Sequence, residues 1–345
     1  MNKTIMYKEI LGQPKNIRDC YDFNKDEIRK IATAIKDFKP ANILITARGT
    51  SMHSGILAKY LFQLYYNIPV AMATPSIFTV YEGKVDLSRT LVIAISQSGG
   101  GKDVMAPIVA ANRQGGLTLA ITNTPDSIVA KEAKHHLYNN CGEAVAYAAT
   151  KTYSTTIYLL MKLLYEITLN QDIRIDENKI VDVMNEALKL EEQVRLLVRD
   201  FKDAHYGLTL ARGYTLSLAM EMALKMKEAC HFPVDAFPTS EFYHGPIVIA
   251  NKETPTVLFA FDKKTNKDVQ KMAMNLKELG VYTLAITNDE NLARLCNQSL
   301  YVSEFNDLHA LFGGIVILQL FTCELALLKD ENPDYAQILD HIDTF

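Results

Sequence analysis

The sequence lacks the features of secreted, membrane-spanning and nucleic-acid-binding proteins. Its five cysteines are scattered without CxxC spacing, which is typical of reduced thiols in a cytoplasmic protein. The net charge is −4 and no basic cluster occurs, so we expect no nucleic-acid partner. The first residues, MNKTIMYKEILGQP, contain no apolar run of a signal peptide. Gln319 and Glu324 interrupt the longest apolar run, 312–328, so we expect a buried helix and no membrane contact.

Motifs for nucleotides and metals are also missing. Neither GxxxxGK[ST] nor GxGxxG occurs, so nucleotide binding has no support. No cluster of His, Cys and Asp has metal-ligand spacing, and we expect neither a metal nor a cofactor. The length of 345 residues suggests two domains of ordinary size or one large domain.

The most informative stretch that is present is Thr90–Asp103. A buried-strand pattern runs into a turn with Ser96, Gln97, Ser98 and Gly99, and a helical pattern follows. Backbone N–H groups at such a helix start, together with serine hydroxyls, suit a phosphate group. A strand–helix turn that merely needs small residues would look similar, so this turn alone does not establish the site.

Two further helix starts carry hydroxyls. The predicted strand 42–47 is followed by Thr50 and Ser51, either of which is a natural N-cap for the helical run 53–66. Ala149, Thr150 and Lys151 precede a predicted helix over 152–169. Turns after parallel strands lie at one edge of the sheet, where ligands of open α/β folds bind.

The second half of the chain repeats the first. Residues 44–78 align without gaps with 208–242, and LTLAITN at 117–123 matches 282–288. A repeat of this length indicates a duplicated domain, and alternating strands and helices predict an α/β fold of two tandem doubly wound parallel sheets. We predict an N-terminal helical segment at 1–40, domains at 41–170 and 201–332, a helical connector at 171–200 and a tail at 333–345.

The two copies differ in their polar residues. The second copy has Phe261-Asp262-Lys263-Lys264 where the first has the serine turn. It adds Glu221, Lys225 and Glu228 on one stripe of a predicted helix 216–230. A stripe like this is usually a solvated surface, but apolar residues cover well over half of this helix. A carboxylate on a buried helix tends to have a raised pKa, as a general base requires.

His244 lies in the stretch SEFYHGP, in a predicted loop before a strand-like IVIA run. A single loop histidine is most often solvated or bonded to the backbone.

These pieces resemble the double sugar isomerase (SIS) domain enzymes. The matching motifs are ARGTS (47–51), SQSG (96–99), ATK (149–151), EMALKMKE (221–228) and SEFYHGP (240–246). The similar enzymes are the isomerase half of glucosamine-6-phosphate synthase, type II glucosamine-6-phosphate deaminases and fructosamine-6-phosphate deglycases. The resemblance implies two flavodoxin-like SIS domains and a small-molecule sugar phosphate as the partner.

The resemblance also implies roles for individual residues. Thr50, Ser51 and the turn 96–99 would hold the phosphate and sugar, with 149–151 beside them. Glu228 would move a proton between C1 and C2, supported by Glu221 and Lys225. His244 would open the sugar ring from a neighbouring subunit, which would make the chain a homodimer with shared active sites.

Three departures from the family pattern matter. Gly101 stands where the synthase has a threonine, and the segment 143–151 is one residue longer than expected. The tail has His341 about where these enzymes carry a lysine, so we expect no Schiff base from the tail. The glutaminase domain of the synthase is not in this sequence, so we expect no ammonia from glutamine.

Three functions stay open. The first is C1/C2 enolisation of an amino-sugar or ketosamine 6-phosphate coupled to C–N cleavage, as in a deaminase or deglycase. The second is plain aldose–ketose isomerisation by the same residues. The third is a phosphosugar sensor without turnover, which would need the serine turn but not Glu228 and His244.

Overall fold

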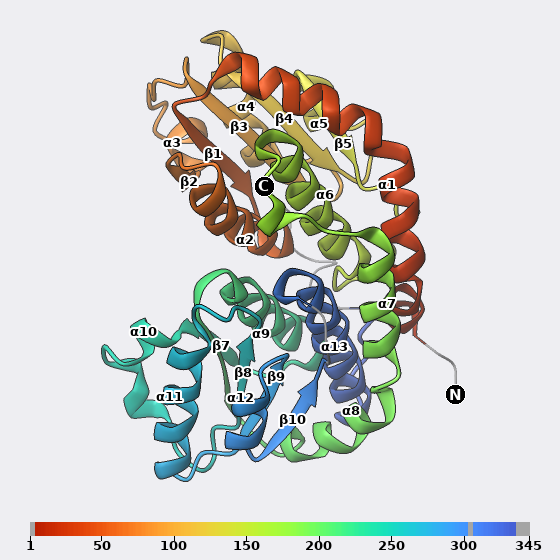
Figure 1. The fold of residues 1–345 in the computed structure, drawn as a ribbon, viewed down its shortest axis with the longest axis vertical. Coiled ribbons are helices and arrows are strands. Elements are labelled where there is room, and N and C mark those ends of the chain that lie inside the picture. Colours follow the sequence, from red (N-terminus) through yellow and green to blue (C-terminus); the bar gives the residue numbers. More distant parts are fainter. Residues whose placement is uncertain (1–3, 303–305, 336–345) are drawn as a thin grey trace. The chain divides into compact units, whose positions relative to one another are not determined.

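A computed structural model describes residues 4–302 and 306–335 of the chain. The chain forms two compact units, each built on one five-stranded sheet (Figure 1). The first-sheet unit contains Lys15–Ala144 and Lys151–Ile175. The second-sheet unit contains the described residues before Lys15, the short insertion Val145–Thr150 and the described residues from Asp176 to 335.

The first sheet is parallel throughout, with strand order β2-β1-β3-β4-β5. Its three central strands are mostly apolar and buried, as expected for a sheet covered on both faces. Since the chain leaves β1 toward one edge and β3 toward the other, right-handed crossovers put α2 (Gly49–Tyr65) and α4 (Lys102–Arg113) on opposite faces. The strands are β1 (Asn42–Ala47), β2 (Val70–Met72), β3 (Thr90–Ser96), β4 (Leu117–Thr122) and β5 (His135–Tyr138).

The helices of this unit form two groups, in which α2 packs on α6 and α4 packs on α3 and α5. Their bounds are α2 (Gly49–Tyr65), α3 (Ser76–Thr79), α4 (Lys102–Arg113), α5 (Ile128–Glu132) and α6 (Lys151–Thr168), with a 3-10 turn η1 (Gln171–Ile173).

The second sheet has the order β7-β6-β8-β9-β10, again with every pair parallel. Position for position this is the order of the first sheet, so the structure confirms the duplicated doubly wound fold. The strands are β6 (Gly207–Ala211), β7 (Val234–Pro238), β8 (Thr256–Ala260), β9 (Thr283–Thr287) and β10 (Gln298–Tyr301).

Helices of the second-sheet unit cover this sheet. Their bounds are α7 (Glu177–Leu188), α8 (Glu191–Leu197), α9 (Leu216–Cys230), α10 (Thr239–Phe242), α11 (Asn266–Glu278), α12 (Glu290–Leu295) and α13 (Asp307–Leu328). Three 3-10 turns join them, η2 (Val198–Phe201), η3 (Gly213–Thr215) and η4 (Pro246–Ile249).

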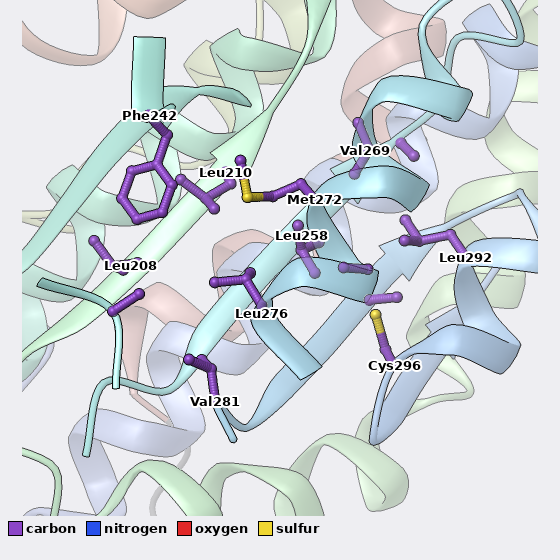
Figure 2. Close-up of a cluster of buried hydrophobic side chains, with 14 residues drawn as sticks. Leu208, Leu210, Phe242, Leu258, Val269, Met272, Leu276, Val281, Leu292 and Cys296 are labelled. Atoms are coloured by element: carbon purple, nitrogen blue, oxygen red, sulfur yellow. The ribbon is translucent and has the colours of Figure 1, made fainter. Parts of the chain in front are cut away.

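One face of the second sheet packs against α11 and α12 (Figure 2). Val269, Met272 and Leu276 follow helical spacing on α11 and are fully buried. They meet strand residues such as Leu210 and Leu258. This core fixes the carboxyl ends of β6 and β8, where the candidate site of this unit begins.

Helix α13 is the buried helix predicted over 312–328. Within the described part of the chain, it is the one helix whose length and composition would let it cross a membrane, yet 83% of its apolar window is buried in the protein. It packs against α7 and α9. A Cβ at Gly314 would lie 2.6 Å from the Phe261 ring, so the close approach requires glycine.

Helix α1 (Ile5–Phe38) lies in the segment 1–40, for which a helical segment was predicted. Met6, Ile10 and Ile17 are fully buried, and this packing outweighs the cost of Pro14 inside the helix. The helical connector predicted over 171–200 contains the separate helical segments η1, α7 and α8 and most of η2.

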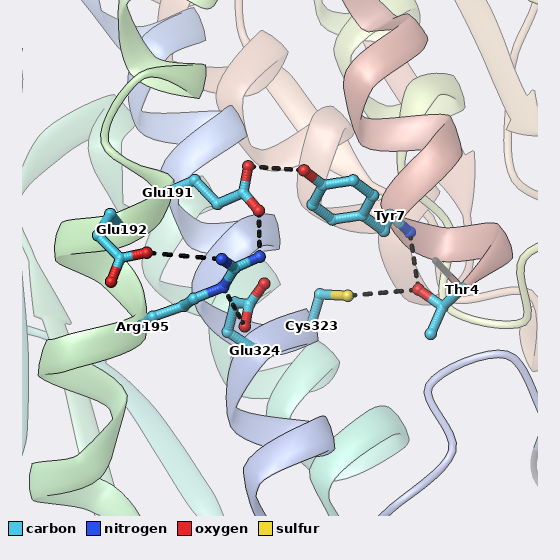
Figure 3. A network of polar contacts seen from close by, with 7 residues as sticks. All are labelled: Thr4, Tyr7, Glu191, Glu192, Arg195, Cys323 and Glu324. Carbon is cyan, nitrogen blue, oxygen red and sulfur yellow. Dashed lines mark hydrogen bonds and ion pairs between the residues drawn. The ribbon is translucent and has the colours of Figure 1, made fainter. Parts of the chain in front are cut away.

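The start of α1 is attached to α8 and α13 by a polar network (Figure 3). The Tyr7 hydroxyl donates to Glu191 Oε2 at 2.6 Å, and Arg195 binds both Glu191 and Glu324. Burial and the hydrogen bond to Glu191 raise the pKa of Tyr7 to about 12, so the phenol remains a donor at neutral pH. The network orients the first turns of α1, which carry Glu9.

Candidate active site

The centre of the candidate site is a charged triad on α9. Lys225 Nζ lies 3.1 Å from Glu221 Oε1 and 3.0 Å from Glu228 Oε2. Spacings of four and three residues place the three side chains on one stripe of the helix. The helix runs from Leu216 to Cys230 as predicted, and packs against α13 and the strands β6 and β7.

Only one member of the triad reaches the surface. The side chains of Glu221 and Lys225 are fully buried, while 24% of the Glu228 side chain is exposed. Burial alone would lower the pKa of Lys225, but the charges of Glu221 and Glu228 outweigh this effect and its pKa is raised. The buried ammonium holds the Glu228 carboxylate through the ion pair at 3.0 Å. Glu221 and Lys225 lie behind it, so direct contact with a ligand falls to Glu228.

In the serine turn 96–99 of the first-sheet unit, the serine hydroxyls bind backbone N–H groups of the same turn and of Gly100. Ser96 Oγ accepts a hydrogen bond from Gly99 N at 3.1 Å, and Ser98 Oγ accepts one from Gly100 N at 3.3 Å. As acceptors, both hydroxyls keep their protons to donate to a ligand. Gly99 has φ +63°, and a Cβ there would lie 2.0 Å from Ser127 Oγ, so only glycine fits. Gln97 Nε2 donates to Ala144 O at 3.5 Å.

Thr50 and Ser51 are half-buried in the first turn of α2. The N-cap is Arg48, so the prediction of Thr50 or Ser51 as the cap was wrong. Gly49 adopts φ +50°, and the helix begins there, four residues before the predicted run 53–66. Strands β1 and β3 are neighbours in the sheet, and the ion pair from Arg48 to Asp103 joins the turns that follow them. Gly101 is the N-cap of α4.

The second-sheet unit has an equivalent Arg–Asp ion pair at the carboxyl edge of its sheet. Arg212 Nε lies 3.3 Å from Asp268 Oδ2, as Arg48 pairs with Asp103 in the first copy. In place of serines this edge has Asp262, which is buried, and burial raises the pKa of its carboxyl. The two copies therefore share a scaffold and differ in the polar groups that it presents.

His244 lies at a cavity of about 280 Å³ at this edge. The imidazole is exposed, and its backbone N–H donates to Glu241 O at 2.9 Å. The strand expected over 247–250 is instead the 3-10 turn η4. Pro246 at its start supplies no N–H for a strand ladder. The other lining residues are Arg212, Thr239, Ser240, Tyr243, Asp268 and Lys271; none comes from α9.

The side chains of Thr150 and Lys151 in the segment 149–151 form hydrogen bonds with other residues of the protein. Thr150 is 1% exposed and its hydroxyl donates to Glu9 Oε2 at 2.7 Å. Lys151 Nζ donates to Glu143 O at 2.6 Å, and Ala149 is half-buried. The Thr150 hydroxyl thus donates to a buried carboxylate, and the role of 149–151 beside the sugar stays a prediction.

The model of the SIS domain matches this chain twice, over residues 38–165 and 201–329. The chain belongs to the SIS domain family. A glutamine–fructose-6-phosphate aminotransferase (isomerizing) from Thermococcus kodakarensis is 30% identical over 342 residues, which cover 95% of this chain and 56% of the relative. The chain thus spans about half the length of this relative.

Solved structures share the fold of this SIS chain. The C-terminal domain of glucosamine-fructose-6-phosphate aminotransferase from Francisella tularensis has a TM-score of 0.84 at 24% identity, with 97% and 98% of the two chains covered. A glucosamine-6-phosphate deaminase from Thermotoga maritima has a TM-score of 0.75 at 18% identity, with 95% and 96% covered. At these identities the likeness establishes the architecture.

Residues 4–302 and 306–335 of this SIS protein contain no group of three His, Cys, Asp or Glu side chains arranged to hold a metal ion. The expectation for His341 lies outside the described residues. Sequence reasoning missed Glu9 and Gln319, which hold the segment before Lys151. No local pattern could have revealed them, because their partners lie far away along the chain.

We predict that Lys225→Met destabilises the protein by about 3–5 kcal/mol, since it leaves Glu221 buried without its cation. Urea unfolding measures the loss. Lys227→Met is the matched control on the same helix: its ion pair with Asp235 is half-exposed and should contribute less than about 1 kcal/mol. Adding Glu221→Gln to Lys225→Met should recover part of the loss. Equal effects of the two lysine substitutions would contradict the triad's role.

Proposed function

We propose that this chain is a phosphosugar enzyme that acts on an amino-sugar or ketosamine 6-phosphate. It shifts the carbonyl between C1 and C2 and cleaves the C–N bond by hydrolysis. The observation that carries the proposal is Glu228, a partly exposed carboxylate held by a fully buried ammonium. The names of the relatives, an isomerizing aminotransferase and a deaminase, support this chemistry.

Glu228 acts as the base in this proposal. With an open-chain 2-amino-aldose 6-phosphate, the carboxylate removes the C2 proton and the electron pair forms a C1–C2 double bond. Return of the proton to C1 produces a ketimine at C2, and water hydrolyses it to ammonia and a ketose 6-phosphate. A base of this kind contributes about 10²- to 10⁴-fold in rate.

The phosphate group is held by the serine turn in this proposal. Ser96 and Ser98 donate their hydroxyl protons to its oxygens, with Thr50 and Ser51 on the neighbouring turn. The start of α4 adds backbone N–H groups and the positive end of its dipole. We also propose that the protein is a cytoplasmic homodimer, with His244 of one subunit opening the sugar ring in the site of the other.

A plain aldose–ketose isomerase is the second candidate, since the same base would serve without C–N cleavage. A non-catalytic phosphosugar sensor is the third. The exposed carboxylate of Glu228 argues against the sensor, because burying Lys225 and Glu221 beneath it costs solvation energy that phosphate binding alone does not require.

We predict that Glu228→Gln lowers turnover by about 10²- to 10⁴-fold while phosphate binding is kept. The assay incubates glucosamine 6-phosphate, a fructosamine 6-phosphate and fructose 6-phosphate in deuterated water, and measures released amine with deuterium at C1 or C2. Glu290→Gln, an exposed carboxylate, is the control. Amine release by the wild-type protein supports C–N cleavage, exchange alone supports the plain isomerase, and binding without exchange supports the sensor.

We predict that Ser98→Ala weakens binding of sugar phosphates by about tenfold or more, because it removes a hydrogen bond to a charged group. Calorimetric titration measures the change, and Ser88→Ala, an exposed serine bonded to Asp86, is the control. An equal loss for unphosphorylated sugars would show that Ser98 does not bind the phosphate.

We predict that inactive His244→Ala and Glu228→Gln chains regain activity when mixed. If His244 acts in the neighbouring subunit, each hybrid dimer has one intact site, and statistical mixing restores about a quarter of wild-type activity. Native mass spectrometry verifies that hybrids form. Hybrids without activity would contradict a shared site.

A further inference from the structure

The cavity of about 280 Å³ in the second-sheet unit is lined by polar groups that the proposed function does not use. Arg212 follows β6, Thr239 follows β7, and Lys271 lies on α11, the helix after β8. In the sheet order β7-β6-β8-β9, the chain leaves β6 toward one side and β8 toward the other. The cavity thus lies at the carboxyl edge where the strand order reverses, which is the usual ligand position in open α/β sheets.

Positive charge exceeds negative charge around this cavity. Arg212 Nε lies 3.3 Å from Asp268 Oδ2, and a guanidinium that is paired through Nε keeps its terminal Nη groups as donors for a further anion. Lys271 lies one turn after Asp268 on α11 and, among residues 4–302 and 306–335, has no ion-pair partner. The Asp268 side chain is 60% exposed, so water screens its negative charge.

Thr239 adds a buried hydroxyl to the cavity. The residue is 1% exposed and lines the cavity, yet its hydroxyl has no hydrogen-bond partner within the part of the chain that the structure describes. Buried hydroxyls in proteins usually have a partner. An oxygen atom of a ligand in the cavity would supply this partner, and the half-buried Ser240 adds a second hydroxyl.

The first copy of the domain does not have these groups. In the gapless alignment of the two copies, Thr239 corresponds to Pro75. The equivalent Arg–Asp ion pairs align α11 with α4, so Lys271 corresponds to Ala106. The second copy therefore has a hydroxyl and an ammonium where the first copy has neither, although it lacks the serine turn.

We propose that this cavity is a second binding site for a phosphate group, formed by Arg212, Thr239 and Lys271. The Nη groups and the ammonium donate charge-assisted hydrogen bonds to the phosphate oxygens, and the Thr239 hydroxyl donates a further one. Pockets for drug-sized ligands have about 300–1,000 Å³, so this cavity suits a smaller ligand, either a phosphate ion or the phosphate end of a sugar phosphate. Its residues all belong to the second-sheet unit, whereas the serine turn belongs to the first-sheet unit.

Methyl NMR on the full chain measures binding at this site directly, because Thr239 carries a methyl group. Threonine methyl groups are labelled, and the protein is titrated with sodium phosphate at constant ionic strength. The signal of Thr239 is assigned by its loss in Thr239→Ser, which keeps the hydroxyl. We expect a saturable shift of this signal, and its absence would overturn the inference.

Lys271→Met tests the ammonium. We expect the dissociation constant of phosphate, followed by the Thr239 signal, to rise about tenfold, because the change removes a charge-assisted hydrogen bond. Lys267→Met is the matched control: this lysine is exposed on the same helix and does not line the cavity, so we expect a change of less than about twofold. Equal effects of the two substitutions would mean unspecific attraction to a positive surface and would overturn the site.

Thr239→Val tests the hydroxyl, because valine keeps the shape of the side chain without a donor. We expect phosphate to bind about tenfold more weakly, followed through the introduced valine methyl groups. Affinity equal to that of the wild-type protein would remove Thr239 from the site.

Glucosamine 6-phosphate and glucosamine separate the two sources of phosphate. Saturation at a lower concentration of glucosamine 6-phosphate than of inorganic phosphate supports a sugar phosphate as the ligand, and equal affinities support the ion alone. Saturation by unphosphorylated glucosamine at the same concentration would overturn the assignment to phosphate.

The site and the proposed function can fail separately. Ser98→Ala should leave the response of the Thr239 signal to phosphate unchanged, since the two residues belong to different units; loss of the response would overturn a second site. A wild-type protein that exchanges no deuterium into any sugar phosphate of the panel overturns the proposed function, while a saturable shift of the Thr239 signal in that protein still supports the phosphate site.

Discussion

The second-sheet unit depends on one buried cation. Lys225 is enclosed in the protein between Glu221 and Glu228, and an ammonium in such a place is stable only with close counter-charges. The requirement constrains α9 on every side: its apolar residues must cover the ammonium, and its stripe must keep both carboxylates within reach. One carboxylate remains at the surface, and its orientation and charge follow from the buried pair.

The duplication explains how the chain came to present two kinds of chemistry. Both copies join the turn after the first strand to the helix after the third by an Arg–Asp pair, Arg48 with Asp103 and Arg212 with Asp268. The same ion pair thus occurs at the carboxyl edge of each sheet, although the neighbouring residues differ. The first copy presents hydroxyls suited to an anion, whereas the second presents a histidine at a cavity and a carboxylate on α9.

Local pattern was enough to predict much of this arrangement. The bounds of α9 follow from its apolar periodicity, and the strand order of the second sheet follows from the repeat. The prediction failed for the start of α2, where Gly49 with φ +50° lies in the first turn, and it did not find the partner of Thr150. Glu9 and Thr150 are 141 positions apart, and no periodicity joins residues across that distance. Contacts of this kind depend on the assembled fold.

The segment Val145–Thr150 shows what such distant contacts do. It is rich in alanine, and small side chains need little room, so two buried side chains, Glu9 and Gln319, can bind its backbone and Thr150 closely. Hydrogen bonds to a charged carboxylate are stronger than neutral ones. The conformation of this segment therefore follows from residues on α1 and α13 that its own sequence does not reveal.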